Sequence, residues 1–511
     1  MPQRLRAIAP LTFLLAACAP NSGGVPAIAD AEAADIQPSD APPADGVSAG
    51  DITSEDVTPE DVAPEDVAPE DSAPGDATAE HPHEDSADVI DRGPPNLVLV
   101  VLDDVGVEVV QPWATLVGAT GEVVETPTLD ALLDDGVAIE TAWAGATCSP
   151  TRWTLHTGTY PSRGGPLGPA VGGSGLTTAS ATLPRILGDT YSTGLFGKWH
   201  LGGGNNAPTT LGGWDVYSGS PEGALADYFA WERVSAVAGS RPVVEDVGTY
   251  ATTAVVDDAL AWLGTVDDTR PWLTMLAFNA PHSPFHVPPE SLRPGYPTAE
   301  LDADGDGECD DDGPCHRAML QALDSELGRF LRSIAASSEE RDTIVIVLGD
   351  NGSPGSVVQA PFDRTHAKFT FFEGGIRVPM WVSGPEERVS ERGTLRVMAH
   401  SADLFATLLE FAGAEVPPGV DAVSLVPALN GAGSQRDTLY MDGEAGPEPF
   451  VEQAAIRDAR YKVQWLDVTA PDLFGCYDLA ADPNEQIDLM GGATPPSECE
   501  TLRQQLLETR R

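Results

Sequence analysis

NLVLVVLDD, at residues 96–104, is a run of six apolar side chains followed by two aspartates. An unbroken apolar run of this kind predicts a β-strand that is buried on both faces, as in a parallel sheet. Further strands are predicted at residues 192–196, 272–278 and 343–348. Each of these is followed by polar groups, in the sequences GKWH (197–200), NAPH (279–282) and GDNG (349–352). We therefore expect four buried strands that each end at residues able to do chemistry.

Segments with helical periodicity lie between these strands, at residues 128–133, 250–263 and 319–334. The alternation predicts an α/β fold, with a large, mostly parallel sheet flanked by helices. Functional groups in such sheets collect at the carboxyl ends of the strands. A lone polar residue there is usually a solvated loop position, but four coincidences predict one shared site. The residues expected to converge are Asp103, Asp104, Lys198, His200, His282, Asp350 and Asn351.

The chain of 511 residues carries 79 acidic and 28 basic side chains, a net charge of −51. So acidic a protein is not attracted to nucleic acid or to anionic lipid, and we exclude both as general partners. The length predicts a large domain with a smaller one beside it. Only three of the basic residues are lysines, Lys198, Lys368 and Lys462. Each therefore raises the question whether arginine could replace it.

The first 18 residues are typical of an export signal. Arg4 and Arg6 precede an apolar stretch, residues 11–17, that is too short to span a bilayer as a helix. LAAC, at residues 15–18, resembles a bacterial lipobox, which implies cleavage before Cys18 and lipidation of that residue. The protein would then be exported and lipid-anchored to the bacterial cell envelope, with no other membrane contact. The alternative is an ordinary secretory signal in which Cys18 is incidental.

Residues 19–94 are predicted to be a disordered acidic tether. From Asn21 to Asp91 the sequence has 20 acidic residues and no lysine or arginine, and TPEDV at 58–62 recurs as APEDV at 63–67. Like charges repel, proline interrupts helices, and little apolar surface is available to bury. An acidic binding segment is the alternative to a plain spacer.

CSPTR at residues 148–152, followed by TGTYP at 157–161, is the most specific motif of the chain. It resembles the C-x-P-x-R element of the type I sulfatases, in the alkaline phosphatase superfamily. The resemblance covers nearly all of residues 95–490 and includes the four strand ends. Other matching segments are TPTLD (126–130), KFTFFEGGIRVP (368–379), DLFATLL (403–409) and YDL (477–479). The family fold implies a catalytic domain at residues 95–440 and a smaller C-terminal α+β subdomain at 441–511.

In that family the cysteine is oxidised to formylglycine by a modifying enzyme, which reads the proline and arginine at +2 and +4. The hydrated aldehyde is the nucleophile. The resemblance implies that Cys148 is this residue, with a buried thiol or half of a disulfide as the alternatives. It also implies Ca²⁺, and oxygen ligands suit Ca²⁺ or Mg²⁺ rather than zinc. The implied metal ligands are Asp103, Asp104, Asp350, Asn351 and the modified Cys148.

The remaining catalytic roles also come from the resemblance. Arg152 would orient the nucleophile, while Lys198 and Lys368 would hold sulfate oxygens as compact ammonium groups. His282 would be the acid for the departing alcohol, and His200 the base that later frees sulfate. Asp350 is a second candidate to accept the proton of the attacking hydroxyl. His156, on the predicted nucleophile helix, is expected to be structural.

Two features lie outside this pattern. Residues 302–310, DADGDGECD, resemble the start of a Ca²⁺ loop, but the twelfth position is Gly313 rather than glutamate, and we expect no helix pair to frame it. A second Ca²⁺ site and a solvated acidic loop both stay open. Four further cysteines in an exported chain predict two disulfides. Cys309–Cys315 with Cys476–Cys499 is the simplest of three pairings.

The resemblance therefore implies a sulfatase that would hydrolyse an aryl or carbohydrate sulfate monoester to an alcohol and inorganic sulfate. One alternative is a phosphonate or phosphate ester hydrolase with the same site. Another is a surface binding protein that has lost catalysis and keeps an unmodified thiol. Residues 92–511 hold 59 acidic against 26 basic side chains. Such a surface repels large polyanions, so we expect a small or sparsely sulfated substrate.

Overall fold

The protein is described by a computed structural model that covers residues 93–169, 173–267, 269–337, 342–446, 449–492 and 495–510. The predicted signal, residues 1–18, and the predicted tether up to residue 92 lie outside the described residues. No helix in the described part of the chain combines the length and the apolar composition needed to cross a membrane.

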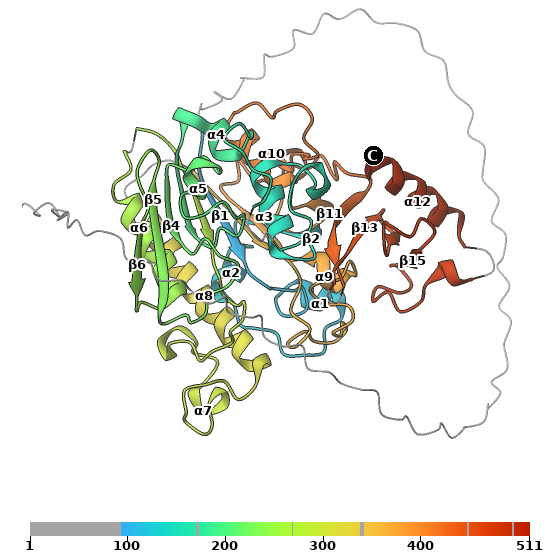
Figure 1. Ribbon diagram of the computed structural model, residues 1–511, viewed down its shortest axis with the longest axis horizontal. Coiled ribbons are helices and arrows are strands. Elements are labelled where there is room, and N and C mark those ends of the chain that lie inside the picture. Colours follow the sequence, from blue (N-terminus) through green and yellow to red (C-terminus); the bar gives the residue numbers. More distant parts are fainter. Residues whose placement is uncertain are drawn as a thin grey trace, which may run out of the picture. The chain divides into compact units, whose positions relative to one another are not determined.

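Eleven strands form the main sheet, in the order β11-β2-β10-β8-β1-β7-β3-β4-β5-β6, with β9 paired to β2 (Figure 1). At its centre β1 is parallel to both β7 and β8, and β3 is parallel to β7 and to β4. These strands are β1 (Asn96–Leu102), β3 (Ser192–Gly197), β4 (Val216–Gly219), β7 (Trp272–Ala277) and β8 (Thr343–Gly349). The four predicted strands are therefore parallel neighbours, and their carboxyl ends lie at one edge of the sheet.

The side chains of β1 alternate between two hydrophobic cores. Leu97, Leu99 and Val101 belong to the core on one face, and the intervening residues belong to the core on the other. Successive side chains of a strand point to opposite faces, so a strand that is covered on both faces must be apolar throughout. Each fully buried valine or leucine side chain contributes about 1.5–3 kcal/mol of transfer free energy. The apolar run at residues 97–102 is thus explained by burial on both sides.

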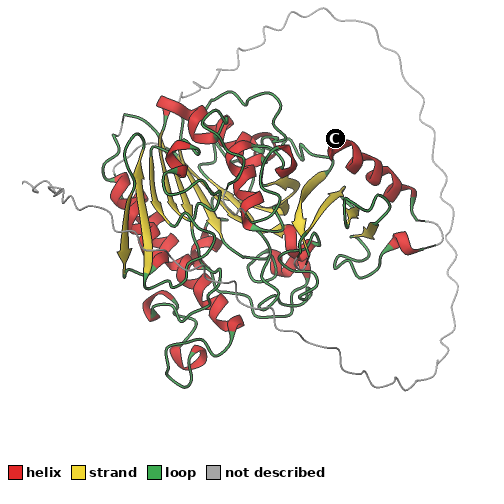
Figure 2. Cartoon of the chain, viewed as in Figure 1, coloured by secondary structure: helices red, strands yellow, loops and turns green. Residues whose placement is uncertain are grey.

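Helices cover both faces of the sheet (Figures 1 and 2). The core with Leu97 includes residues of α3 (Cys148–Thr157), α4 (Leu183–Leu187) and α10 (Asp403–Phe411). The core with Val98 includes residues of α6 (Ala251–Leu263) and α8 (Asp312–Ala335). The short helices are α1 (Trp113–Val117), α2 (Pro127–Ala131), α5 (Ala207–Thr210), α9 (Glu373–Ile376) and α11 (Val426–Leu429).

The predicted α/β class is confirmed, although several strands of the sheet run antiparallel. β10 (Met380–Ser383) is antiparallel to both of its neighbours, β8 and β2. β5 and β6 continue the sheet beyond β4 in antiparallel order. The remaining strands are β2 (Gly136–Trp143), β5 (Trp231–Val237), β6 (Val243–Val247), β9 (Arg377–Val378) and β11 (Gly393–His400).

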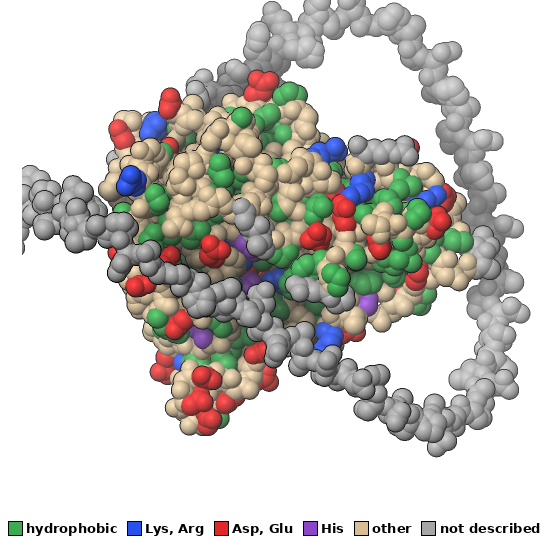
Figure 3. Space-filling view, viewed as in Figure 1, with side chains coloured by type: hydrophobic (Ala, Val, Ile, Leu, Met, Phe, Trp, Pro, Cys, Tyr) green, Lys and Arg blue, Asp and Glu red, His purple; other side chains and the backbone are tan. Residues whose placement is uncertain are grey.

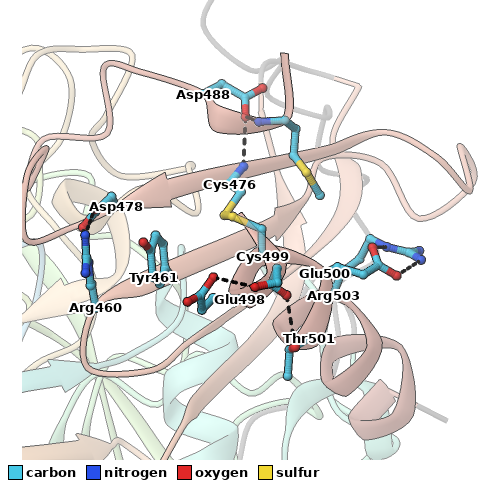
Figure 4. The surroundings of a disulfide bond; sticks show 12 residues. Arg460, Tyr461, Cys476, Asp478, Asp488, Glu498, Cys499, Glu500, Thr501 and Arg503 are labelled. Atoms are coloured by element: carbon cyan, nitrogen blue, oxygen red, sulfur yellow. Dashed lines mark hydrogen bonds and ion pairs between the residues drawn. A yellow bond between two sulfur atoms is a disulfide. The ribbon is translucent and has the colours of Figure 1, made fainter. Parts of the chain in front are cut away.

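A second, smaller sheet begins at Leu439 and forms the C-terminal subdomain with α12 (Ser497–Arg510). Its antiparallel strands are β12 (Leu439–Ala445), β13 (Val451–Arg457), β14 (Tyr461–Trp465) and β15 (Phe474–Asp478). Leu502 and Leu506 of α12 pack with Val463 of β14 in a separate core. The predicted Cys476–Cys499 disulfide is confirmed and joins β15 to α12 (Figure 4).

The predicted Cys309–Cys315 disulfide is also confirmed, and it closes the acidic loop at residues 302–310. The expectation that no helices frame this loop was wrong, because α7 (Thr298–Leu301) precedes it and α8 follows it. α7 is a single turn, too short to give a periodic signal, and α8 begins earlier than predicted because Asp311 caps the amide of Gly313. Figure 3 shows acidic side chains gathered at this part of the surface.

Candidate active site

The carboxyl ends of the four central strands bring the predicted residues together. Asp103 and Asp104 follow β1, and Asp350 and Asn351 follow β8. Lys198 and His200 follow β3, while His282 lies five residues beyond β7. Because these strands are parallel neighbours, the residues meet at one edge of the sheet.

Helix α3 adds Cys148 and Arg152 to this edge. Cys148 is the first residue of the helix, and Arg152 lies one turn later on the same side. Thr151 ties the start of the helix to the end of β8. Its Oγ1 donates to the carbonyl oxygen of Asp350 at 2.6 Å and accepts the amide N–H of Gly145 at 2.7 Å.

Asp103 holds two of the basic side chains. Its Oδ2 forms a close ion pair with Nζ of Lys198 and lies 3.6 Å from a guanidinium nitrogen of Arg152. Its Oδ1 lies 3.4 Å from Sγ of Cys148. All these side chains are almost fully buried. Charges at such a depth are tolerated only when they are paired, so the three groups form one electrostatic unit.

Asp104 holds the third basic side chain. Its Oδ1 pairs with Nζ of Lys368 at 2.6 Å and accepts Nδ2–H of Asn351 at 2.7 Å. Burial raises the pKa of Asp104, but Lys368, His282 and Lys198 more than offset this effect, so its pKa is lowered overall. Its φ of 71° lies in the left-handed region, which is uncommon for residues other than glycine. Asp104 is therefore a carboxylate held in a constrained backbone.

Asp350 completes the acidic set. One of its carboxylate oxygens accepts a guanidinium N–H of Arg152 at 2.9 Å, and the other accepts the amide of Asp104 at 3.2 Å. Burial and the neighbouring Asp103 raise its pKa, against the effect of Arg152. The buried cluster thus contains three carboxylates, Asp103, Asp104 and Asp350, and three cations, Arg152, Lys198 and Lys368.

Part of this cluster is able to hold a metal ion. One potential ligand atom from each of Asp103, Asp104, Cys148 and His282 lies within 4.8 Å of the others. Oδ1 of Asn351 is buried and has no hydrogen-bond partner among the described residues. An orphaned buried amide oxygen on a residue that contacts the carboxylate of Asp104 suits a hard cation such as Ca²⁺ or Mg²⁺.

The thiol of Cys148 is protonated in this environment. Burial and the adjacent Asp103 raise its pKa to about 12, although Lys198 and Lys368 act in the opposite direction. The thiolate is the reactive form of cysteine, so the unmodified side chain is a weak nucleophile at neutral pH.

The two predicted acid–base histidines lie at the outer side of the cluster. Nδ1 of His282 is 2.7 Å from the carbonyl oxygen of Ser283, which can only accept, so Nδ1 carries the hydrogen. Its Nε2 is directed at Asp104, 3.8 Å from Oδ2, and 17% of its side chain is exposed. Burial, the largest cause, and the nearby lysines lower the pKa of His282 to about 4, against the effect of Asp104. Burial also lowers the pKa of His200.

Two residues that the sequence did not single out contact the site through backbone atoms. Nε2 of His316, on α8, lies 2.9 Å from the carbonyl oxygen of Asp104. The hydroxyl of Tyr228 lies 2.7 Å from the carbonyl oxygens of both Asn279 and His282. No spacing of side chains in the sequence indicates such contacts, because the acceptors are main-chain oxygens.

The ring nitrogens of His156 are bonded within the core and not to the predicted reacting side chains. Its Nδ1 is 2.7 Å from the carbonyl oxygen of Arg152, and its Nε2 accepts the indole N–H of Trp214 at 3.1 Å. Burial lowers its pKa to about 4. Both ring nitrogens are used within the core, as expected for a structural histidine.

The acidic loop brings three carboxylates together. Ligand atoms of Asp302, Asp304 and Asp306 lie within 4.8 Å of one another. Each carboxylate also accepts backbone N–H groups of the same loop, for example those of Gly305 and Gly307 on Asp302. These hydrogen bonds help to fix the conformation of the loop.

Comparison with known families gives two matches. The model described as "Sulfatase" matches residues 95–414, and the one described as "N-sulphoglucosamine sulphohydrolase, C-terminal" matches residues 363–511. Arylsulfatase A of Homo sapiens is 28% identical over 468 residues, 79% of this chain and 85% of that protein. Arylsulfatase J of Mus musculus is 27% identical over 340 residues, 63% of this chain and 53% of that protein. The chain thus spans about half the length of the mouse relative.

A similar solved structure is that of a protein in complex with its substrate D-glucosamine-2-N,6-O-disulfate. Its TM-score is 0.65 at 20% sequence identity, and the match covers 82% of this chain and 97% of that one. At this level of identity the likeness concerns the fold.

Proposed function

The chain belongs to the sulfatase family, and from this premise we propose that it hydrolyses a sulfate monoester to an alcohol and inorganic sulfate. The observation that carries the proposal is the buried cluster of three carboxylates and three cations around Cys148, at the first turn of α3. The transition state of sulfate ester hydrolysis spreads negative charge over the sulfate oxygens. Positive groups that are already held in place stabilise it most effectively.

We propose that Asp103, Asp104, Asp350 and Asn351 hold Ca²⁺, with Mg²⁺ as the alternative. The hard oxygen donors and the unpartnered Oδ1 of Asn351 support this assignment. The bound ion would supply Lewis-acid polarisation of the sulfate oxygens. The carboxylates and cations of the cluster balance in number, so a divalent ion would give the site the positive charge that an anionic substrate needs.

We propose that a formylglycine-generating enzyme converts Cys148 to formylglycine, which would supply the nucleophilic hydroxyl. The CSPTR sequence at residues 148–152 supports the modification. The thiol itself, whose pKa burial raises to about 12, is poorly suited to attack a sulfate ester.

We propose roles for the other side chains from the family resemblance, and their contacts support some of these roles. Lys198 and Lys368 would bind sulfate oxygens as ammonium groups, and Arg152 would orient the nucleophile while pairing with Asp350. His282, with Nδ1 fixed on the carbonyl oxygen of Ser283, would be the acid for the departing alcohol. Its pKa of about 4 leaves Nε2 without a proton at neutral pH, so the bound anionic sulfate would have to raise that pKa before Nε2 could deliver a proton. His200 would act as the base that later frees sulfate. Each acid–base step of this kind contributes roughly 10²–10⁴-fold in rate.

We propose that the substrate is a small or sparsely sulfated aryl or carbohydrate ester. The names of the relatives support both classes: two are arylsulfatases, and a protein of the same fold binds a sulfated glucosamine. The net charge of −51 supports the restriction in size and charge, because long-range repulsion opposes the approach of a polyanion.

We also propose that the protein is exported and anchored through a lipid on Cys18. The basic start, the short apolar stretch and the LAAC sequence at residues 15–18 support this location. The two disulfides fit an oxidising compartment outside the cytosol.

Mass spectrometry of the tryptic peptide 93–152, from protein made in its native host, tests the nucleophile. We expect the mass of the aldehyde, or of its hydrate, in place of the thiol at Cys148. Finding only cysteine would refute the nucleophile and favour a binding protein that has lost catalysis.

Parallel assays on aryl sulfate, aryl phosphate and a phosphonate monoester test the reaction. We expect the sulfate to be the best substrate, and a preference for either phosphorus ester would overturn the proposed reaction.

A further inference from the structure

One loop contacts both histidines that are proposed to move protons. We define the β4–β5 loop as residues 220–230, which connect β4 to β5. At its start, the amides of Trp199 and His200 donate to the carbonyl oxygens of Ser220 and Pro221 at 3.0 and 3.1 Å. Near its end, Tyr228 reaches the turn that carries His282. The loop therefore bridges the segments that follow β3 and β7.

Gly223 of this loop lies directly against the imidazole of His200. A methyl group at Gly223 would lie 2.4 Å from Nε2 and 2.6 Å from Cε1 of that ring, closer than atoms can approach. The backbone of His200 has φ of 51°, and its Nδ1 is buried without a hydrogen-bond partner among the described residues. Hydrogen bonds of the ring therefore do not fix its position, and contact with Gly223 limits it on one side.

Tyr228 holds the other histidine through the main chain. Its hydroxyl lies 2.7 Å from the carbonyl oxygens of Asn279 and His282, the first and last residues of one turn. The amide of His282 closes that turn by donating to Asn279 at 2.9 Å. A hydroxyl has a single hydrogen to donate, so the two carbonyl oxygens share it. Burial raises the pKa of Tyr228 well above its usual value, so the group stays a donor.

The ring of Tyr228 is itself fixed. It is 2% exposed and packs on the imidazole of His286 at 4.3 Å between ring centroids. His286 in turn lies 3.1 Å, through Nε2, from the hydroxyl of Tyr250. A buried, packed side chain transmits its position to the groups that it bonds, so movement of the β4–β5 loop would move the turn at Asn279–His282.

We propose that the β4–β5 loop is a positioning element for the two histidines, in which Gly223 sets the ring of His200 and the hydroxyl of Tyr228 sets the turn that carries His282. Neither residue touches the substrate in this proposal. The proposal rests on the proposed function, because it assigns His282 to the departure of the alcohol and His200 to the release of sulfate. The contact of Tyr228 must then affect departure of the alcohol, and the contact of Gly223 must affect release of sulfate. Kinetic measurements can therefore distinguish the two contacts.

Tyr228→Phe removes only the hydroxyl and tests the first contact. An alkyl or carbohydrate sulfate needs acid assistance, whereas 4-nitrophenyl sulfate has a good leaving group and needs little. We expect kcat/KM to fall roughly tenfold to a hundredfold for the former and less than about threefold for the latter. The matched control is Tyr191→Phe, which removes a buried hydroxyl that donates to the carbonyl oxygen of Pro95 at 2.7 Å, near the start of β3. It should leave the leaving-group dependence unchanged.

Gly223→Ala tests the second contact by displacing the ring of His200. We expect slow sulfate release, seen as a burst of about one equivalent of alcohol per enzyme and then a steady rate that no longer depends on the leaving group. The control is Gly491→Ala, because a methyl group there meets no atom within 4 Å. The proposal is wrong if Gly223→Ala lowers kcat/KM equally for all substrates without a burst and Tyr228→Phe also lowers kcat/KM equally for both kinds of substrate.

A measurement that does not depend on turnover can test this proposal independently of the proposed function. Imidazole nitrogen signals can be followed in ¹⁵N-histidine-labelled protein that keeps the unmodified Cys148. Tyr228→Phe should shift the signals of His282 and leave those of His156 in place, while Gly223→Ala should shift those of His200. If the wild-type protein hydrolyses no sulfate ester but these shifts occur, the proposed function fails and the positioning role stands. If the signals of His282 and His200 do not move, the positioning role fails.

Discussion

Asn351 donates its amide hydrogen to Oδ1 of Asp104 at 2.7 Å, which turns its own Oδ1 toward a buried position without a hydrogen-bond partner in the described structure. The same oxygen of Asp104 pairs with Lys368 at 2.6 Å. Asn351 and Asp104 therefore belong to one hydrogen-bonded network. In this network the Oδ1 atom of Asn351 has no partner in the described part of the chain, and the charge of Asp104 is neutralised by Lys368. Such a network can stay folded without an ion and gain stability when one binds.

Removal of divalent metal should lower both stability and turnover. An ion that binds only the folded state stabilises it by mass action, so we expect chelation with EDTA to lower Tm by at least about 5 °C. Added Ca²⁺ should restore Tm and turnover. The variant carrying both Asp304→Asn and Asp306→Asn removes charge from the acidic loop alone and should keep the response to EDTA. Unchanged Tm and turnover in EDTA would contradict the metal assignment.

Lys198→Arg should abolish most turnover although it keeps the charge. Lys198 is fully buried against Asp103, and the guanidinium of Arg152 already occupies the space beside the same carboxylate. A second planar guanidinium has no room there and cannot present a compact ammonium group. We expect kcat to fall at least about 100-fold.

Lys462→Arg is the matched control for that variant. Lys462 is equally buried and pairs with Glu485 at 2.8 Å and Glu373 at 3.2 Å, away from the cluster around Cys148. We expect it to lower Tm while kcat per folded molecule stays near the wild-type value. Near-wild-type kcat for Lys198→Arg would show that the scarcity of lysine carries no functional meaning.

The sequence was most informative where physical constraints act on runs of side chains. β1, β3, β7 and β8 were predicted because strands at the centre of a covered sheet need apolar side chains on both faces. β10 was not predicted, because its four residues are too few to distinguish a strand from a loop. The three lysines are buried and paired with carboxylates, a feature that their rarity in the sequence did not predict.

The convergence of the strand-end residues followed from topology, but the finer structure of the site did not. Cys148 and Arg152 were identified only through a family resemblance, because nothing in their spacing alone distinguishes them from other helical residues. The contacts of His316 and Tyr228 end on main-chain oxygens and leave no pattern in the sequence. Such positioning contacts require coordinates.

Glu108→Gln should change how stability depends on pH. Glu108 is fully buried, and burial raises its pKa to about 7 against a smaller opposing effect of Ser353. The ordinary glutamate pKa is about 4.3, so between pH 4.3 and 7 the folded state binds more protons than the unfolded state. Stability from this group is therefore lost as pH rises through that window, by about 4 kcal/mol in total.

Urea unfolding of both proteins between pH 5 and pH 8 measures this effect. The glutamine variant carries no titrating group there, so its stability relative to wild type should increase with pH. The difference between the two proteins cancels contributions from buried histidines such as His156, which act in the opposite direction between pH 4 and 6.5. A pH-independent difference would contradict the raised pKa of Glu108.

The Cys476–Cys499 disulfide should contribute more stability than Cys309–Cys315. The first pair is separated by 23 residues and the second by six, and the loss of entropy in the unfolded chain grows with loop length. We expect replacement of Cys476 and Cys499 by alanine to cost about 3 kcal/mol, and replacement of the other pair to cost about 1 kcal/mol less. Thermal unfolding of the two double variants provides the comparison. An equal loss of stability in both would show that loop length does not govern the contribution of a disulfide.

Salt should affect highly charged and singly charged substrates differently. Residues 92–511 hold 59 acidic against 26 basic side chains, so attraction for sulfate must come from the buried cluster, whereas the surface repels anions at longer range. The Debye length falls from about 30 Å at 0.01 M to about 10 Å at 0.1 M salt, which screens the surface but not the buried contacts. For a polysulfated oligosaccharide kcat/KM should therefore rise as salt increases to 0.1 M, while for a neutral aryl group bearing one sulfate it should change little. A steep fall for the polysulfated substrate would mean that a positive surface outside the cluster attracts it, and the proposed preference for sparsely sulfated esters would be wrong.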